Sequence, residues 1–224
     1  MHRTGELYGQ FQTLDQQRES ATLGMWVFLI TEVMFFGGLF LTYTINRGIY
    51  SVAFAEASRE LNVNMGGGNT AVLILSSFTM AMAVWASQTG KKKQIILFLI
   101  ATLVLGSVFL GVKYFEYAEK FHHHLIPGPG FAFHPKSVEA IAQDPYIHSH
   151  AQLFFSLYFG MTGLHALHMI VGAGLLIWLI RQASRGRFTP EYNTPVELVG
   201  LYWHFVDIVW IYLFPLLYLI DRHK

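Results

Sequence analysis

Long apolar stretches separated by shorter polar or turn-rich stretches dominate this sequence. About 20 apolar residues in a helix span a hydrocarbon core about 30 Å thick, and five stretches reach that length. They cover residues 21–45, 69–88, 94–117, 150–180 and 196–220. The pattern therefore predicts an all-α, polytopic transmembrane bundle with five spans within residues 21–220, preceded by a polar N-terminal segment at residues 1–20.

Glycine and proline mark the expected breaks between the spans. Three consecutive glycines occupy positions 66–68, just before the second span, and a Pro-Gly-Pro-Gly run occupies positions 127–130. Both patterns are typical of turns, so regular structure is expected to stop at each.

Composition agrees with a membrane protein and removes several other classes. Hydrophobic residues make up 53% of the chain and charged residues 13%, whereas soluble domains carry about 25% charged residues. A net charge of +1 offers no large basic surface, so no nucleic acid partner is expected. The absence of cysteine from all 224 residues excludes thiol nucleophiles and thiolate-held clusters in this chain.

The distribution of lysine and arginine predicts the orientation. Eight of these residues lie on the side of the N-terminus and six on the opposite side, where acidic residues dilute them. The eight are Arg3, Arg18, Lys91, Lys92, Lys93, Arg181, Arg185 and Arg187; the six are Arg47, Arg59, Lys120, Lys136, Arg222 and Lys224. Cytoplasmic loops carry the positive excess, so the N-terminus is predicted to be cytoplasmic and the C-terminus outside. The first 20 residues do not resemble a cleavable signal peptide.

A carboxylate interrupts the first span. Glu32 lies eleven residues after Ala21, which is roughly 16 Å into the membrane at 1.5 Å per residue. A charge facing lipid at that depth costs about 2.5 to 3.5 kcal/mol or more. Glu32 must therefore be protonated, paired, or turned towards protein or water, and we expect it to be a functional carboxyl.

Two further clusters follow from spacing, since residues three or four apart share a helix face. His204 and Asp207 in the fifth span could form a proton relay, a metal ligand with its hydrogen-bond partner, or a structural pair buried between helices, which we favour. His165 and His168 in the fourth span could bind haem or copper, with His204 as a third ligand. Hydrogen-bonded core histidines are the favoured alternative, because haem needs axial ligands on both sides of its ring.

Lys113 and Glu116 lie three apart near the end of the third span, flanked by Tyr114 and Tyr117. The pattern favours an ion pair that snorkels to the interface beside aromatic belt residues, over a proton or lipid-headgroup site.

Histidines are also frequent in the predicted outer loop. They are His122, His123, His124, His134, His148 and His150. Such a tract resembles a metal-binding sequence, but no ordered set of ligands is evident, and polar surface is the favoured interpretation.

The order of these motifs resembles one family. Residues 24–40 around Glu32, residues 111–117, residues 163–172 with Gly-Leu-His-Ala-Leu-His-Met-Ile-Val-Gly, and residues 201–210 with Leu-Tyr-Trp-His-Phe-Val-Asp-Ile-Val-Trp carry the resemblance. Together they resemble subunit III of the haem–copper terminal oxidases, the cytochrome c oxidase subunit III family, over residues 20–220.

The resemblance implies an accessory subunit of an oxidoreductase complex, without a catalytic site of its own. Glu32 would be the family's buried membrane carboxyl, and His165, His168, His204 and Asp207 would be packing and hydrogen-bonding positions. Haem and copper would belong to subunits I and II, while this chain would pack on subunit I, hold phospholipid, and support proton supply and durability during turnover. The chain departs from the seven-span form of the family, so the lipid cleft of that form is in doubt here.

Within the family the resemblance favours a cytochrome c oxidase over a quinol oxidase or a nitric oxide reductase. Five spans without a transit-like leader favour a bacterial inner membrane. A secondary transporter or channel is the alternative from another class, although no inverted repeat is evident. A haem- or copper-binding electron carrier is a further alternative.

Overall fold

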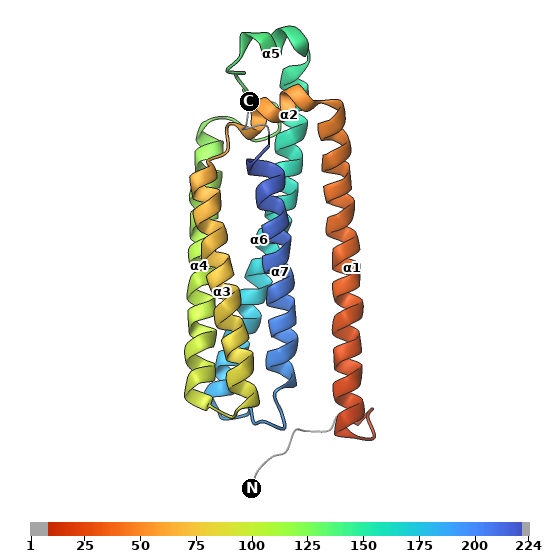
Figure 1. Cartoon of the computed structure of the whole chain (residues 1–224), viewed down its shortest axis with the longest axis vertical. Coiled ribbons are helices and arrows are strands. Elements are labelled where there is room, and N and C mark those ends of the chain that lie inside the picture. Colours follow the sequence, from red (N-terminus) through yellow and green to blue (C-terminus); the bar gives the residue numbers. More distant parts are fainter. Residues whose placement is uncertain (1–8, 221–224) are drawn as a thin grey trace. The chain divides into compact units, whose positions relative to one another are not determined.

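Helices form the regular structure of this chain, of which the computed structural model describes residues 9–220. In chain order they are α1 (Leu14–Ile49), α2 (Ser51–Ser58), α3 (Val63–Gln88), α4 (Lys92–His122), α5 (Val138–Gln143), α6 (Ile147–Ser184) and α7 (Thr194–Tyr218) (Figure 1). Strands are absent from residues 9–220, where Thr189 and Tyr192 form an isolated β-bridge. The all-α prediction is confirmed.

Five of these helices, α1, α3, α4, α6 and α7, are long and apolar enough to cross a membrane. They contain 36, 26, 31, 38 and 25 residues, so all five exceed the about 20 residues that the hydrocarbon core requires. Each contains its predicted span, except that α7 ends at Tyr218, two residues before the predicted end. The assignment of these five helices as membrane spans therefore follows from their length and composition.

The first helix begins within the predicted N-terminal segment, residues 1–20. Because α1 begins at Leu14, the last residues of the predicted 1–20 segment are the first turns of a helix. Residues 1–8 and 221–224 lie outside the described residues, and with them Arg3, Arg222 and Lys224 of the orientation argument.

Glycines end two of the long helices. Gly90 after α3 and Gly186 after α6 have φ angles of 69° and 72°, a left-handed conformation that glycine adopts without steric cost. The next amide in each case bonds to the carbonyl five residues earlier, Lys91 to Ala86 and Arg187 to Gln182. This is the Schellman arrangement, which satisfies the last carbonyls of a helix.

The chain divides into two compact units. Unit 1 comprises Met1–Met34, Val72–Ser107 and His168–Asp207, and unit 2 comprises Phe35–Ala71, Val108–Leu167 and Ile208–Lys224. Each of the five long helices contributes one segment to each unit.

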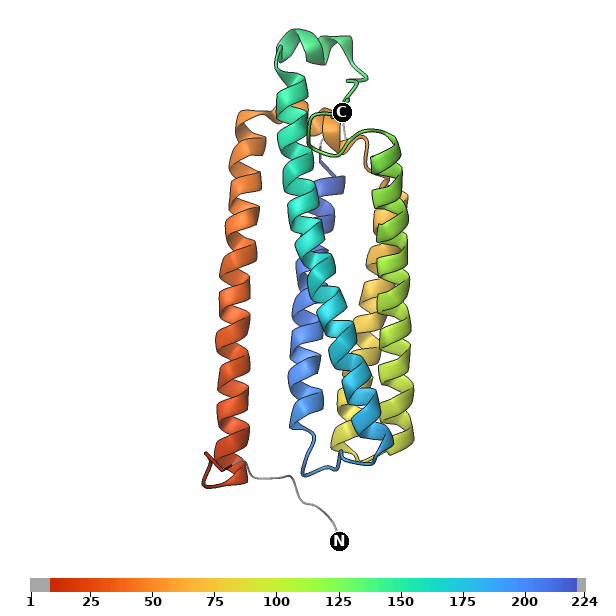
Figure 2. The same cartoon turned by 180° about the vertical axis from the view of Figure 1, so that it is seen from behind.

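In unit 1 the packing centres on Trp203 of α7, which is fully buried. A Cβ atom at Gly106 of α4 or at Gly172 of α6 would lie 2.9 Å from the indole ring. Glycine at both positions therefore lets α4 and α6 approach the ring closely. The α3 and α4 helices run side by side in both views (Figure 1 and Figure 2). In unit 1 a hydrogen bond joins them, because the Ser76 hydroxyl of α3 donates to the Thr102 carbonyl of α4, 3.3 Å away.

In unit 2 an aromatic cluster joins α1, α2 and α6. The ring of Phe54 lies 5.4 Å from those of Tyr43 and Phe154, measured between centroids, and all three side chains are fully buried. Next to it, the buried carboxylate of Glu56 accepts hydrogen bonds from the Arg59 guanidinium and the Lys136 amide. These contacts hold the segment before α5 against α2.

The prediction of a turn at residues 66–68 is wrong, because these three glycines lie inside α3. In unit 2 a Cβ atom at Gly66 would lie 2.9 Å from the Phe214 ring and 3.0 Å from the Tyr218 ring. Gly66 thus permits close packing of α3 on α7 instead of ending the helix. The Pro-Gly-Pro-Gly run at 127–130 lies in a non-helical segment, as predicted.

Candidate functional site

Glu32 of α1 is paired with His168 of α6 in unit 1. Its Oε2 atom lies 3.2 Å from Nε2 of His168, and the two side chains are 19% and 17% exposed. The sequence left three alternatives for Glu32: protonation, pairing, or a position facing protein or water. In the structure its side chain is paired with an imidazole. The pair joins two helices that are more than a hundred residues apart in the sequence.

Tyr202 of α7 adds a third helix to this pair. Its hydroxyl donates to the His168 carbonyl over 2.9 Å, and its ring stacks on that of Phe28, one turn before Glu32 on α1. The arrangement fixes the backbone of His168 at the same point where its ring meets Glu32. We call Glu32, His168 and Tyr202 the carboxyl–imidazole cluster.

The second cluster, Ser77, His204 and Asp207, also lies in unit 1. Nδ1 of His204 lies 2.7 Å from the Ser77 hydroxyl of α3. Asp207 is 2% exposed, and neither of its carboxyl oxygens makes a direct hydrogen bond of standard geometry. His204 therefore bonds to a serine of another helix, and the ion pairs within residues 9–220 do not include one between His204 and Asp207.

The third cluster, in unit 2, contains a buried ion pair. Nζ of Lys113 lies 2.9 Å from Oε2 of Glu116, and the two side chains are 4% and 2% exposed. The Tyr158 hydroxyl of α6 donates to Oε1 of Glu116 over 2.7 Å, and the Tyr218 hydroxyl of α7 donates to the same oxygen. The Lys113 ammonium also lies 4.7 Å from the centre of the Trp210 ring.

The predicted ion pair of Lys113 and Glu116 is present, but its side chains are buried, so the expectation that they snorkel outwards is wrong. Both charged groups point into the protein because two tyrosine hydroxyls and a tryptophan ring replace the water that they lose. A buried pair of this kind needs such additional hydrogen bonds to offset its desolvation. Tyr114, by contrast, is 72% exposed, as expected of a belt residue.

His165 lies in an aromatic environment in unit 2. Its ring centroid is 5.4 Å from that of Phe109 on α4 and 5.2 Å from that of Trp210 on α7, and the side chain is 1% exposed. His165 and His168 thus have different neighbours, one among rings and the other beside a carboxylate.

The outer-loop histidines have individual contacts. His150 lies 2.7 Å from Asp144 and stacks on Tyr50, while His148 packs edge-on against Phe133. Among residues 9–220 no three histidine, aspartate or glutamate side chains are grouped so as to hold a metal ion.

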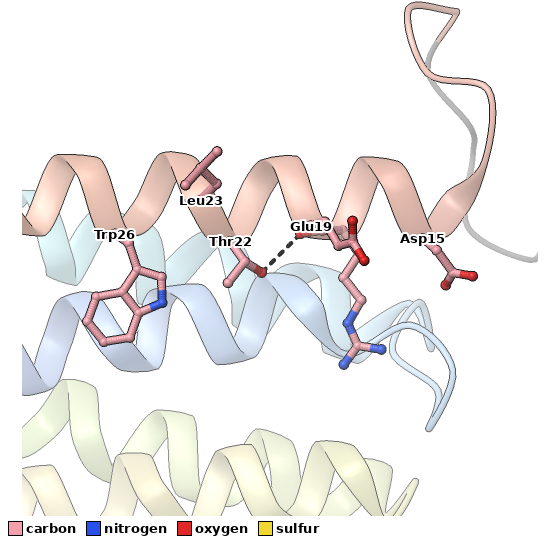
Figure 3. Close-up of a pocket in the computed structure, with 6 residues that line it drawn as sticks. Asp15, Glu19, Thr22, Leu23 and Trp26 are labelled. Carbon is pink, nitrogen blue, oxygen red and sulfur yellow. Dashed lines mark hydrogen bonds between the residues drawn. The ribbon is translucent and has the colours of Figure 1, made fainter.

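The N-terminal turns of α1 border a cavity in unit 1. The cavity has a volume of about 900 Å³ and lies between these turns, Trp178 of α6 and residues 187–198. Its lining includes both charges and aromatic rings, namely Asp15, Arg18, Arg187, Glu191, Trp178 and Tyr192. Figure 3 shows a separate pocket along α1, where Asp15, Glu19, Thr22 and Trp26 follow one another with charged residues before the tryptophan. This order is typical of a helix entering a membrane.

Sequence reasoning did not identify Ser77, Tyr158, Tyr202 or Tyr218. The three tyrosines could have been singled out because each lies within an apolar run. A buried tyrosine hydroxyl usually has a hydrogen-bond partner, so a polar group on another helix was to be expected near each. Each donates to a group on a different helix, so spacing along one helix could not reveal the pairing.

Taken together, the long apolar helices and the polar groups engaged between them define a polytopic membrane protein. Comparison with known proteins identifies its family. The family model described as cytochrome c oxidase subunit III matches residues 138–221. The cytochrome c oxidase subunit 3 of Corynebacterium diphtheriae is 33% identical over 89% of this chain and 88% of its own length.

Two further relatives agree. The cytochrome c oxidase subunit 3 of Thermostichus vulcanus is 31% identical over 99% of this chain and all of the relative, 100%. The quinol oxidase subunit 3 of Bacillus spizizenii is 30% identical over 88% of this chain and 85% of the relative. The chain belongs to the subunit III family of the haem–copper oxidases, as the sequence motifs had indicated. None of these relatives is named as a transporter or an independent electron carrier, so they do not support those alternatives.

Proposed function

We propose that this chain is subunit III of a cytochrome c oxidase, which packs on subunit I and supports proton supply and durability during turnover. The redox centres of the assembly, haem and copper, would belong to subunits I and II. The observation that carries the proposal is the Glu32–His168 pair, a partly buried carboxyl and imidazole joining α1 to α6.

The chemistry of this pair suits an accessory role. An imidazole and a carboxylate in contact can share or pass on a proton without electron transfer. With exposed fractions of 19% and 17%, the pair is not fully enclosed, so protons could exchange with water or a partner surface nearby. The proposed role is to hold protons close to the uptake path of the catalytic subunit.

Bound phospholipid is the second part of the proposal. The cavity at the N-terminal turns of α1 combines Arg18 and Arg187 with Asp15 and Glu191, and apolar residues line it further. A zwitterionic headgroup carries a phosphate and an ammonium, which match these two kinds of side chain. A lipid there would support the side of α1 that the rest of unit 1 leaves exposed.

The proposed location is a bacterial inner membrane, with the N-terminus in the cytoplasm and the C-terminus outside. Support comes from the clusters of lysine and arginine at residues 91–93, around the start of α4, and at residues 181–187, around the end of α6.

A quinol oxidase is the second candidate, favoured by the relative of that name at 30% identity. The Pro-Gly-Pro loop with its histidines and the glutamate at position 32 favour cytochrome c as the donor. Purification of the assembly in mild detergent, followed by assays with cytochrome c and with a quinol, distinguishes the two. Oxidation of quinol alone would reject the first candidate.

The accessory role is tested with Glu32→Gln in the assembled oxidase. We expect initial oxygen reduction to be retained and inactivation during turnover to be faster. The matched control is Glu19→Gln, an exposed glutamate on the same helix, which should behave as the wild type. Immediate loss of oxygen reduction in Glu32→Gln would show that the residue serves the chemistry itself.

A further inference from the structure

We infer that Glu197 sets the headgroup selectivity of the cavity in unit 1, so that the cavity takes a zwitterionic phospholipid and disfavours an anionic one. The inference rests on the phospholipid site proposed above and names the residue that decides which class of lipid it takes. Glu197 lies in the first turn of α7, between Pro195 and Leu198, which line the cavity. All three residues belong to unit 1.

The charges that line the cavity balance one another. Of the described residues in its lining, Arg18 and Arg187 are basic, while Asp15 and Glu191 are acidic, so the lining carries no positive excess. A zwitterionic headgroup can place its phosphate beside an arginine and its ammonium beside a carboxylate. An anionic headgroup has no ammonium to offer, so the carboxylates repel it.

Glu197 adds a further carboxylate next to this lining. Its Oε2 atom lies 3.6 Å from Nη2 of Arg18, and the two side chains are 27% and 51% exposed. An exposed ion pair of this kind contributes little to the stability of the fold. Its charge nevertheless offsets the field of Arg18 at the cavity, which tips the balance there against an anionic headgroup.

Gln88, the last residue of α3, holds Glu197 in this position. Its side-chain amide donates to Oε1 of Glu197 over 2.8 Å, while Oε2 is the oxygen near Arg18. The two carboxylate oxygens thus contact two different helices, α3 and α1. A glutamine at position 197 can still accept the bond from Gln88 through its carbonyl oxygen. Glu197→Gln therefore removes the charge and keeps the contact.

Lipid competition in the purified assembly tests the inference. The assembly is equilibrated in mild detergent with equal amounts of phosphatidylethanolamine and phosphatidylglycerol that carry the same acyl chains, and native mass spectrometry counts each lipid retained. The lipid that Arg187→Gln loses, in each background, is the share held by the cavity. We expect phosphatidylethanolamine to dominate this share in the wild type. Glu197→Gln should shift the ratio towards phosphatidylglycerol by roughly fivefold, the effect of about one charge near an anionic headgroup.

Glu60→Gln is the matched control. Glu60 is also an ion-paired glutamate, 2.8 Å from Lys136 and 26% exposed, but it belongs to unit 2. Its replacement should leave the ratio unchanged. Gln88→Ala keeps the charge of Glu197 and releases its side chain, so we expect a smaller shift in the same direction as in Glu197→Gln.

Two results would overturn the inference and leave the lipid site in place. One is an unchanged ratio in Glu197→Gln. The other is an equal shift in Glu60→Gln, because the loss of any acidic charge would then have the same effect. If Arg187→Gln loses no lipid in any background, the cavity holds none, and the lipid part of the proposed function fails together with this inference. The electron donor does not enter this readout, so the choice of donor stands apart from it.

Discussion

Nζ of Lys113 and Oε2 of Glu116 lie 2.9 Å apart in unit 2, and neither side chain is more than 4% exposed. Tyr158 and Tyr218 reach the same carboxylate from α6 and α7, so one ion pair on α4 organises contacts with two other helices. Breaking such a pair on one side only leaves an uncompensated buried charge.

We therefore expect Lys113→Met and Glu116→Gln each to destabilise the chain by roughly 3–5 kcal/mol, and the double variant to lose less than the sum. Thermal release of the chain from the purified assembly measures the effect. Tyr114→Phe, an exposed neighbour, is the control. Additive losses would mean that the two side chains do not act as a pair.

The contact between Glu32 and His168 in the carboxyl–imidazole cluster leads to a second prediction. Glu32→Gln and His168→Gln should each lose about 1.5–3 kcal/mol, the range for a hydrogen bond to a charged group, because each removes the same bridge. The double variant should be no worse than either single variant. Inactivation rates during turnover and thermal stability both report on this, and a double variant with twice the effect would contradict the pairing.

The contacts of Trp203 predict the effect of a single methyl group. At Gly172 a Cβ atom would lie 2.9 Å from the indole ring and 3.1 Å from the Tyr202 ring, so Gly172→Ala should cost about 1–3 kcal/mol by overpacking. Gly174, two residues later on the same helix, has no atom within 4 Å of its Cβ position. Gly174→Ala should be neutral or slightly stabilising, since alanine favours helix. Equal effects in a thermal unfolding assay would show that the α6–α7 contact is not as close as described.

The cavity of unit 1 predicts a difference between two arginines. Arg187 lines the cavity and Arg185 does not. We expect Arg187→Gln to reduce the phospholipid retained after mild detergent purification, as counted by native mass spectrometry, and Arg185→Gln to leave it unchanged. Loss of lipid from both variants would indicate a general effect of surface charge.

The sequence predicted the long helices well because the signal for a membrane span lies within about 20 consecutive apolar residues. It failed at residues 66–68, where glycine was interpreted as a turn although Gly66 serves the packing of Phe214 and Tyr218. Whether a glycine ends a helix or admits a neighbouring ring depends on a residue far along the chain, which local pattern does not contain.

The candidate site was predicted only in part, for a related reason. Spacing of three or four placed His204 with Asp207 and Lys113 with Glu116, because the helical repeat fixes which residues share a face. It did not identify Ser77 or Tyr218, since the rotation of one helix against another decides which hydroxyl meets the His204 imidazole and which meets the Glu116 carboxylate. The ion pair of Lys113 was expected to snorkel outwards, but it is buried because its aromatic surroundings come from two other helices.

The bond from Lys113 to the Tyr218 hydroxyl spans 105 residues and ends at the last residue of α7. During synthesis Lys113 and Glu116 therefore reach the insertion machinery long before Tyr218 has been synthesised. The nascent polypeptide must therefore carry two charges through an unfinished stage, shielded by each other or by the translocation apparatus, until its final helix arrives to complete the enclosure.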